Sequence, residues 1–543
     1  MDPRQITGAL GKAARAEDVL SICRDHLREL NHIHVNAALG KLAKSRGLPR
    51  HLTTDRTFVE LVRLATRLTE RGQYGARGLS NTMHAIAKMH QIGVVCADNK
   101  EVTDLVAALE RRAREVARDM NAQNVANLMW AYAKLGRAPA APTWEALERR
   151  AVEVARDMDP QAVANLTWAY ATLGRPPGAE TWEALERRAR EVARDMDQQP
   201  VANLMWAYAT LGRVPAAPTW EALERRARDV ARDMDPQAVA NLMWAYATLG
   251  RAPAAATWEA LERRARDVAR DMKPQEVASL MWAYATLGRA PAAATWEALE
   301  RRAEDVARDL NPQNVANLMW AYAKLGRAPG AATWEALERR AREVARDMIP
   351  QNVANLMWAY ATIGRAPGAA TWEAVERRAE EVARDMNAQN VANLMWAYAT
   401  LGRAPGAETW EALERRAVEV ARDMVPKNVA DLTLAFAALG RPLGILLWEA
   451  LERRAGEVAS KMTPTQVSNL MWAYGTLGRA PGAATWEALE RRAVEAVRDM
   501  IPQEASNLTW AFAALGRVPG AATWEALVRR AEEVARDRDA QQV

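Results

Sequence analysis

The stretch Thr143-Trp144-Glu145-Ala146-Leu147-Glu148-Arg149-Arg150 sets the plan of the chain, because nearly the same eight residues return every 38 residues. The tryptophan of this octet has counterparts at Trp182, Trp220, Trp258, Trp296, Trp334, Trp372, Trp410, Trp448, Trp486 and Trp524. A fixed period of this length is typical of a solenoid, in which each unit buries its apolar face against copies of itself.

A second tryptophan recurs with the same period, in the phrase Asn127-Leu128-Met129-Trp130-Ala131-Tyr132-Ala133. Its counterparts are Trp168, Trp206, Trp244, Trp282, Trp320, Trp358, Trp396, Trp472 and Trp510, with Leu434 in the one gap. The two series account for all 21 tryptophans. The constant period outweighs the several domains that 543 residues would otherwise suggest, and we expect one elongated array.

The composition narrows the functional classes. Lys and Arg number 73 against 68 Asp and Glu, so the net charge of +5 is only a weak indication of a polyanionic partner. The two cysteines, Cys23 and Cys96, are too few for a disulfide scaffold. We see no apolar run of the roughly 18 residues that a membrane span needs, and the first twenty residues predict neither a secretory signal nor a transit peptide.

Each unit contains signals for two helices. In the first helix, Asp159 precedes Pro160 at an N-terminus and Gly174 supplies a left-handed C-cap; every one of the eleven units has this glycine. A loop of about seven residues follows. In the second helix we expect Thr143 to be the N-cap, with Glu145 in the first turn.

The second helix has one apolar stripe, formed by Trp144, Leu147, Ala151, Val154, Ala155 and Met158. Its other face is charged, and we expect pairs such as Glu145 with Arg149 on a solvated outer wall. Tryptophans at regular spacing could stack on nucleic-acid bases. Since both series lie among Leu, Met and Val, we interpret the tryptophans as core.

The first hundred residues carry weaker copies of the same pattern. Leu79 to Lys88 aligns with Val125 to Lys134, Val35 to Lys44 is a poorer match, and residues 102–120 contain a second half-unit without its tryptophan. We therefore expect degenerate helical repeats that act as a cap over 1–101, a regular array over 102–539 and a tail over 540–543.

The first helix also carries polar positions, numbered here from its N-cap, so that Asn121 is position 1. Position 7 is occupied by Asn127, Asn165, Asn203, Asn241, Ser279, Asn317, Asn355, Asn393, Asp431, Asn469 and Asn507. Position 4 varies and includes Asn124, Asn314, Asn352, Asn390 and Asn428, while position 14 is mostly Thr, with Lys134 and Lys324. Because positions 4, 7 and 14 share a helix face, we expect a polar strip. Its asparagines either form hydrogen-bond ladders between units or contact the edges of bases.

Arginine follows the C-cap glycine in every unit, as at Arg137, Arg327, Arg365 and Arg403. A cation here complements the helix dipole, and a row of them could also hold phosphates.

These residues together resemble the octotricopeptide repeat family. The resemblance lies in a 38-residue unit with a Pro-containing loop that ends in Trp, such as Pro139 to Trp144, followed by a Leu/Ala/Arg helix and the phrase Val-Ala-Asn-Leu-Met-Trp-Ala-Tyr-Ala-Lys-Leu-Gly, over residues 102–539. It implies an all-α fold, a right-handed α-solenoid of antiparallel helix pairs similar to the pentatricopeptide proteins. It also implies binding of organellar transcripts, in a mitochondrion or chloroplast, to control their stability, processing or translation.

Catalysis has little support in the sequence. The nearest approach to a metal pattern, Cys23-x-x-His26 with His90 and Cys96, lacks paired ligand spacing, and no phosphate-binding glycine loop is present. We expect a protein with no cofactor, metal, membrane or small-molecule substrate that binds single-stranded RNA through its concave first-helix face. The alternative is a protein-protein interaction scaffold.

Overall fold

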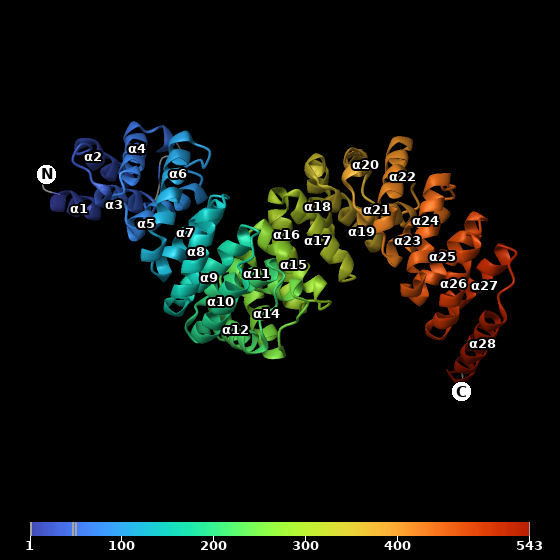
Figure 1. Ribbon diagram of the computed structural model, residues 1–543. Coiled ribbons are helices and arrows are strands. Elements are labelled where there is room, and N and C mark those ends of the chain that lie inside the picture. Colours follow the sequence, from blue (N-terminus) through green and yellow to red (C-terminus); the bar gives the residue numbers. More distant parts are fainter. Residues whose placement is uncertain (1–2, 46–47, 49–51, 542–543) are drawn as a thin grey trace. The chain divides into compact units, whose positions relative to one another are not determined.

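The computed structural model describes residues 3–45, 48 and 52–541, and all regular structure in these residues is helical. The chain divides into two compact units, Met1–Val268 and Ala269–Val543. Antiparallel helix pairs lie side by side in both (Figure 1). The expected all-α fold of stacked helix pairs is confirmed, while the hand of the superhelix stays a prediction.

The first unit carries fourteen α-helices in its described residues. These are α1 (Pro3–Lys12), α2 (Ala16–Asp25), α3 (His32–Leu42), α4 (Arg56–Glu70), α5 (Ala76–Gln91), α6 (Lys100–Glu115), α7 (Ala122–Lys134), α8 (Ala141–Val154), α9 (Pro160–Thr172), α10 (Ala179–Val192), α11 (Gln198–Thr210), α12 (Ala217–Val230), α13 (Pro236–Thr248) and α14 (Ala255–Val268).

The second unit continues the series with fourteen more in the part that the structure describes. These are α15 (Pro274–Thr286), α16 (Ala293–Val306), α17 (Pro312–Lys324), α18 (Ala331–Val344), α19 (Pro350–Ile363), α20 (Ala369–Val382), α21 (Ala388–Thr400), α22 (Ala407–Val420), α23 (Pro426–Ala438), α24 (Ile445–Val458), α25 (Pro464–Leu477), α26 (Ala483–Ala496), α27 (Pro502–Ala514) and α28 (Ala521–Gln541). A short 3-10 turn follows each second helix from α6 to α26, such as η7 (Ala307–Asp309) after α16.

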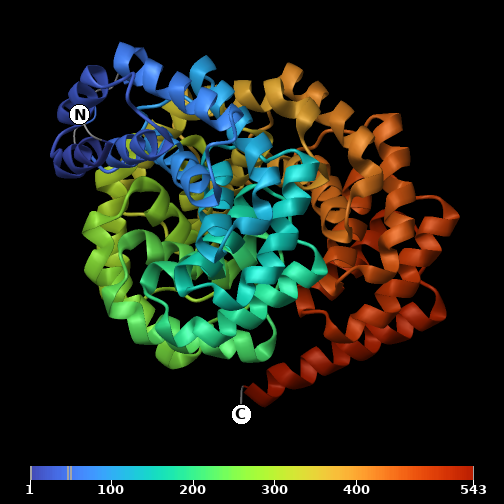
Figure 2. The ribbon, with the colours of Figure 1, turned by 60° about the vertical axis from the view of Figure 1, so that its left-hand side comes forward.

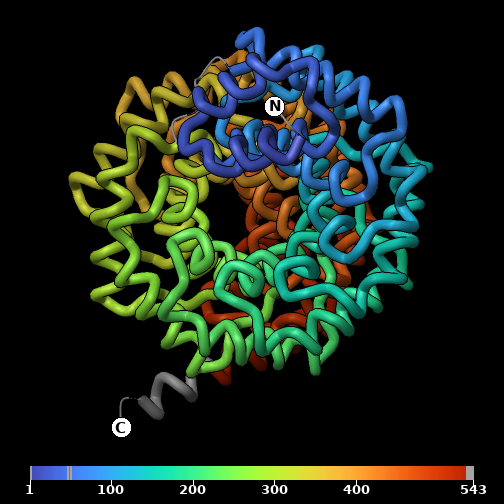
Figure 3. Tube along the Cα trace, turned by 90° about the vertical axis from the view of Figure 1, so that its left-hand side faces the viewer, coloured from blue at the N-terminus to red at the C-terminus, as the bar shows by residue number. Residues whose placement is uncertain are grey.

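Within each unit the two helical layers pack differently. Neighbouring first helices, which carry odd numbers, contact each other along most of their length, whereas the even-numbered second helices are more loosely packed against one another. A stack whose layers differ in spacing curves toward the tighter layer. The first helices therefore line the inner side of each curved unit, whose successive helix hairpins can be followed in Figures 2 and 3.

The first-helix termini are confirmed. The Asp159 side chain accepts a hydrogen bond from the Ala162 N–H at 2.7 Å, and Pro160 begins α9. Gly174 has a φ of +63°, and the Arg175 N–H donates to the Tyr170 carbonyl, as expected for a left-handed C-cap that satisfies the last carbonyls.

The expected cap of the second helix is wrong. Helix α8 begins at Ala141, two residues before Thr143, and Thr143 is buried inside its first turn. The N–H of Ala140 instead donates to Oε1 of Glu110 at 2.7 Å, in the second helix of the preceding pair. In later pairs the equivalent carboxylates accept the same hydrogen bond from a backbone N–H. They belong to Glu148, Glu186, Glu224, Glu300, Glu338, Glu376, Glu414, Glu452 and Glu490. The helix end is thus satisfied by a neighbouring pair, which the local sequence does not reveal.

The apolar stripe of the second helix is confirmed, since Trp144, Leu147 and Met158 are all buried. The expected pair of Glu145 with Arg149 is wrong: in the described residues Arg150 pairs with Glu153 at 2.7 Å, and its Nε donates to the Met120 carbonyl. Part of the charged face therefore joins one helix pair to the next.

The N-terminal helices continue the same arrangement. The segment Leu79 to Lys88 lies in α5, which packs against α7, and the segment from Val35 onward lies in α3, which packs against α5. The cap, array and tail boundaries stay predictions, and residues 542–543 of the tail lie outside the described residues.

Candidate nucleic-acid interface

One face of each first helix stays open to solvent. In α17, Gln313 and Lys324 are exposed and Asn317 and Trp320 are partly buried. These are positions 3, 7, 10 and 14, and their spacing of four, three and four residues places them on one side of the helix. We call this set of positions, repeated along the first helices of each unit, the first-helix strip.

The tryptophans of the strip are not core residues, and the expectation that both series are buried is wrong for this one. Trp320 and its equivalents are partly buried, and Trp510 is 46% exposed. Their rings lie next to one another from helix to helix: the Trp320 centroid lies 6.4 Å from those of Trp282 and Trp358, with the first pair stacked at an interplanar angle of 30° and the second tilted at 36°.

Similar ring pairs occur elsewhere in the strip. They are Trp168 with Trp206 and Trp206 with Trp244 in the first unit, and Trp358 with Trp396 and Trp472 with Trp510 in the second. Where Trp130 approaches Trp168, the ammonium of Lys134 lies 5.6 Å from one ring centroid and 4.5 Å from the other. Burial lowers the pKa of this lysine. In α5 the ring of His84 takes the tryptophan position, 4.6 Å from Trp130.

The second-helix tryptophans, in contrast, are mostly core, as expected. Trp258, Trp334 and Trp372 are each 1% exposed. Trp182 is partly buried and Trp524, in the last helix, is 55% exposed. A tryptophan is thus a core anchor at one point of the repeat and a surface group at the other.

Position 4 does not belong to the open strip, which corrects the expected grouping. Asn124, Asn314, Asn352, Asn390 and Asn428 are each 5–6% exposed. Most of these side chains lie in the first helical turn and accept a hydrogen bond from the N–H of the N-cap residue, as Asn124 does from Asn121 at 3.3 Å. Their role is to cap the helix, so we leave them out of the strip.

Position 7 lies on the strip, and the alternative of an asparagine ladder is wrong. In the described part of the chain, no hydrogen bond joins a position-7 side chain to the next unit. The bonds that occur run within one helix, from Gln161 to Asn165, from Lys427 to Asp431 and from Gln503 to Asn507. Amides such as Asn317 and Asn355 therefore keep donor and acceptor capacity for a ligand.

The arginine that follows each C-cap glycine has a specific neighbour. The guanidinium of Arg175 lies 4.1 Å from the ring centroid of Trp144, and Arg327, Arg365 and Arg403 make the same contact at 4.2–4.4 Å with Trp296, Trp334 and Trp372. Stacking of a cation on an aromatic face favours Arg over Lys. These arginines are exposed, so the edges of their guanidinium groups can still bind anions. At Arg137 the corresponding earlier position is Val106.

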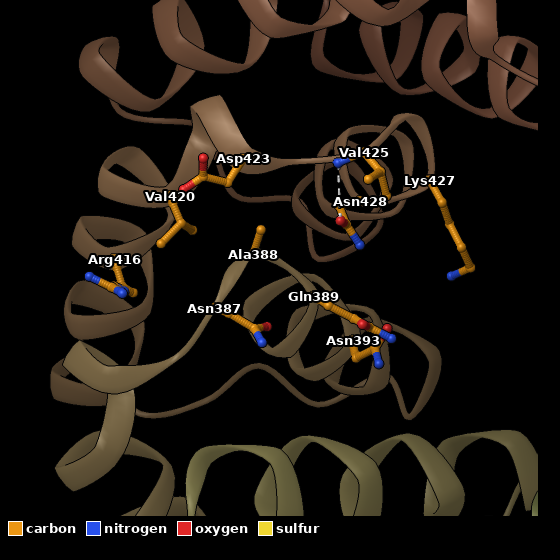
Figure 4. Close-up of a pocket in the computed structure, with 10 residues that line it drawn as sticks. All are labelled: Asn387, Ala388, Gln389, Asn393, Arg416, Val420, Asp423, Val425, Lys427 and Asn428. Carbon is orange, nitrogen blue, oxygen red and sulfur yellow. Dashed lines mark hydrogen bonds between the residues drawn. The ribbon is translucent and has the colours of Figure 1, made fainter. Parts of the chain in front are cut away.

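A pocket of about 460 Å³ opens at the edge of the strip between α21 and α23 (Figure 4). Asn387, Gln389 and Asn393 line it from the α21 side, and Lys427 and Asn428 line it from α23. It is the part of the strip where amides and a lysine of neighbouring units face a common space.

Sequence reasoning missed two members of the strip. Gln occupies position 3 in nine of the eleven units, and Trp occupies position 10 in ten. The repeated Gln was a usable signal, because a polar residue that recurs one turn before position 7 shares its face.

The described residues hold no cluster of three or more His, Cys, Asp or Glu side chains suited to a metal. Across the same ranges, every helix is too short or too polar to cross a bilayer.

Comparison with known proteins gives one family match. The family described as RNA-editing substrate-binding complex 6 protein matches residues 65–292, less than half of the chain. No curated protein matches the sequence.

Two structures show a distant likeness. One is a chain in a homology model of the full-length AP-3 complex in an intermediate open conformation; it is 10% identical with a TM-score of 0.30, and the match covers 95% of this chain and 93% of that one. The other belongs to a structure in which Kap95p binding induces the switch loops of RanGDP to adopt the GTP-bound conformation; it is 10% identical with a TM-score of 0.32, over 95% of this chain and 76% of that one.

Proposed function

We propose that this chain binds single-stranded RNA along the first-helix strip and carries out no chemistry of its own. The observation that carries the proposal is the row of partly exposed tryptophans whose rings lie next to one another, flanked on most of these helices by amides at positions 3 and 7. Aromatic rings stack on any base, at about 1–3 kcal/mol per base, and amides can pair with base edges.

The spacing of the rings favours a single strand over a duplex. Neighbouring ring centroids lie 6.0–6.4 Å apart, whereas bases of a duplex strand rise by about 3.4 Å. A strand that places one base on each unit must therefore be extended, with its bases unstacked from one another. Bases in this state expose the edges that proteins recognise in RNA.

The arginine row supplies the cations that such a strand needs. The strip itself is nearly uncharged, but α17, α19 and α21 each end next to an exposed arginine whose guanidinium stacks on a tryptophan. Phosphates bound at this rim would then supply affinity, and bases bound on the strip would supply base recognition.

The comparisons support the same reading. The matching family is described as an RNA-editing substrate-binding complex protein, and the resemblance to octotricopeptide repeats implies control of transcript stability, processing or translation. A mitochondrial setting stays part of the proposal, whereas no comparison supports a chloroplast setting. Protein partners are compatible with a complex of this kind.

The test compares two variants by mobility shift with a randomised single-stranded RNA pool. Replacing Asn317, Asn355 and Asn393 with Ala should weaken RNA binding far more than duplex DNA binding. Replacing Arg327, Arg365 and Arg403 with Gln should weaken binding to all sequences and flatten its salt dependence, because phosphate contacts release counterions.

A matched control exists for the arginine variant. Arg339, Arg377 and Arg415 are exposed on the second helices, and their replacement with Gln removes the same charge from the outer wall. This control should change the salt dependence much less. Thermal melts of all variants separate lost binding from lost folding. If the wild-type protein has no RNA affinity at moderate salt, the proposal fails and the protein-scaffold alternative replaces it.

A further inference from the structure

The strip is almost the same on every unit of the array, with one marked exception at α23. Neighbouring α21 carries Gln389, Asn393, Trp396 and Thr400 at positions 3, 7, 10 and 14. Helix α23 differs at all four, with Lys427, Asp431, Leu434 and Ala438. A surface that repeats the same groups has no means to fix the position of an RNA along it, so the exceptional unit is where register and sequence preference can arise.

The geometry at α23 is distinct as well. The stack of rings that runs through Trp320, Trp358 and Trp396 ends there, because Leu434 has no ring, and stacking begins again between Trp472 and Trp510. The pocket of about 460 Å³ opens at the N-terminal ends of α21 and α23, where Gln389 and Lys427 line it. Figure 4 shows Lys427 on α23 and Gln389 and Asn393 on α21, all three on the side of the pocket away from Arg416.

The charged pair at this unit is held on the strip. The ammonium of Lys427 bonds to the carboxylate of Asp431 one turn later, and the lysine side chain is 58% exposed while that of the aspartate is 15% exposed. An ammonium has three donors, so two remain for a ligand while Asp431 fixes its position. The aspartate is therefore a positioning residue.

The chemistry of these donors selects one base. The amides of the regular units match adenine, which presents N7 as acceptor and N6 as donor on one edge, whereas a lysine ammonium matches guanine, whose N7 and O6 are both acceptors. We propose that α23 is the specificity-determining unit of the array, where Lys427 recognises a guanine within an otherwise adenine-rich single strand. This inference rests on the proposed function.

The experiment measures binding by fluorescence anisotropy with an all-adenine RNA longer than the array and with the same RNA carrying one central guanine. The wild-type protein should bind the second RNA about tenfold more tightly. One central cytosine or uracil in the same place should give no such gain.

The matched variant restores the regular repeat with Lys427→Gln and Asp431→Asn. It should bind both RNAs equally, with an affinity for the all-adenine RNA at least that of the wild type. Because neighbouring α21 carries Gln389 and Asn393 at these two positions, the variant should melt at the wild-type temperature, so a change in preference reports recognition and not folding. Asp431→Asn alone should reduce the guanine preference while leaving the affinity for all-adenine RNA intact.

Each other outcome overturns the inference in a recognisable way. If the wild type binds RNA without preferring guanine, the inference fails and the proposed function stands. If the double variant loses affinity equally for both RNAs, Lys427 is a phosphate contact, and if it keeps the preference, recognition lies elsewhere. If the wild type binds no single-stranded RNA at moderate salt, both the inference and the proposed function fail.

Discussion

The guanidinium carbon of Arg365 lies 4.2 Å from the ring centroid of Trp334, although Trp334 belongs to α18 and Arg365 follows α19. The contact joins the start of the second helix of one pair to the end of the first helix of the next pair. It gives the arginine after each C-cap glycine a structural role beyond the helix dipole, and it explains why an arginine is present where a lysine would serve a dipole equally well.

Arg365→Lys should lower local stability by about 0.5–1 kcal/mol, because an ammonium stacks less well on the indole face. Hydrogen exchange of the amides in α18 and α19 measures the change. Arg137→Lys is the control, since Val106 stands where other units have the tryptophan. Equal effects at the two sites would show that the stacking contributes nothing.

Trp334 and Trp320 should respond differently to truncation. Trp334→Ala removes a ring that is 1% exposed and should cost about 3–5 kcal/mol. Trp320→Leu copies the residue that stands naturally at Leu434 and should cost less than Trp334→Ala, because the Trp320 ring is already partly exposed, while weakening RNA binding. Chemical denaturation measures the stability of both variants, and RNA titration measures their affinity. If the Trp320→Leu protein is strongly destabilised but binds RNA normally when folded, the Trp320 ring is a core residue and not part of the binding surface.

Glu300 joins two neighbouring helix pairs. Its Oε1 accepts a hydrogen bond from the Gly330 N–H at 2.5 Å, and its Oε2 accepts one from Nε1 of Trp296 at 3.0 Å. Glu300→Ala leaves both donors unpaired and should destabilise the protein by about 1–3 kcal/mol. Glu297, exposed on the same helix, supplies the comparison: Glu297→Ala should change stability by less than about 0.5 kcal/mol. Urea denaturation of the two variants that gave the same midpoint would contradict the role of Glu300.

The buried tyrosines should make the protein sensitive to alkali. Burial, reinforced by the nearby carboxylates of Glu300, Glu338 and Glu376, raises the pKa of Tyr322, Tyr360 and Tyr398 above the ordinary value. The unfolded chain ionises these phenols above about pH 10 while the folded chain keeps them neutral. The unfolded state then binds fewer protons, so stability is fully present below pH 10 and falls as the pH rises further.

Replacement of these three tyrosines by phenylalanine tests the point. Within the described residues their hydroxyls are buried without a hydrogen-bond partner, and Phe436 and Phe512 occupy the same position in other units. The triple variant should be at least as stable as the wild type at pH 7 and should lose less stability between pH 9 and 11. A marked loss at pH 7 would mean that the hydroxyls are satisfied in solution.

The sequence by itself determined the features that depend on neighbours along the chain. The period, the two helices of each unit, the cap at Asp159 and the left-handed Gly174 all follow from local backbone chemistry, and so does the apolar stripe through Trp144. Such features could be predicted because each is satisfied within a turn or two of the residue that specifies it.

The tertiary structure decided the features that depend on the next helix pair. Trp320 and Trp334 both stand among apolar residues, yet only the packing of adjacent first helices leaves one of them open. Asn124 was expected on the polar strip and is buried as a cap. The charged face of the second helix was expected to be a solvated wall, but its Glu148 and Arg150 bond to neighbouring helix pairs. Exposure and hydrogen bonding between units are set by groups roughly one repeat away, and no window of local sequence contains them.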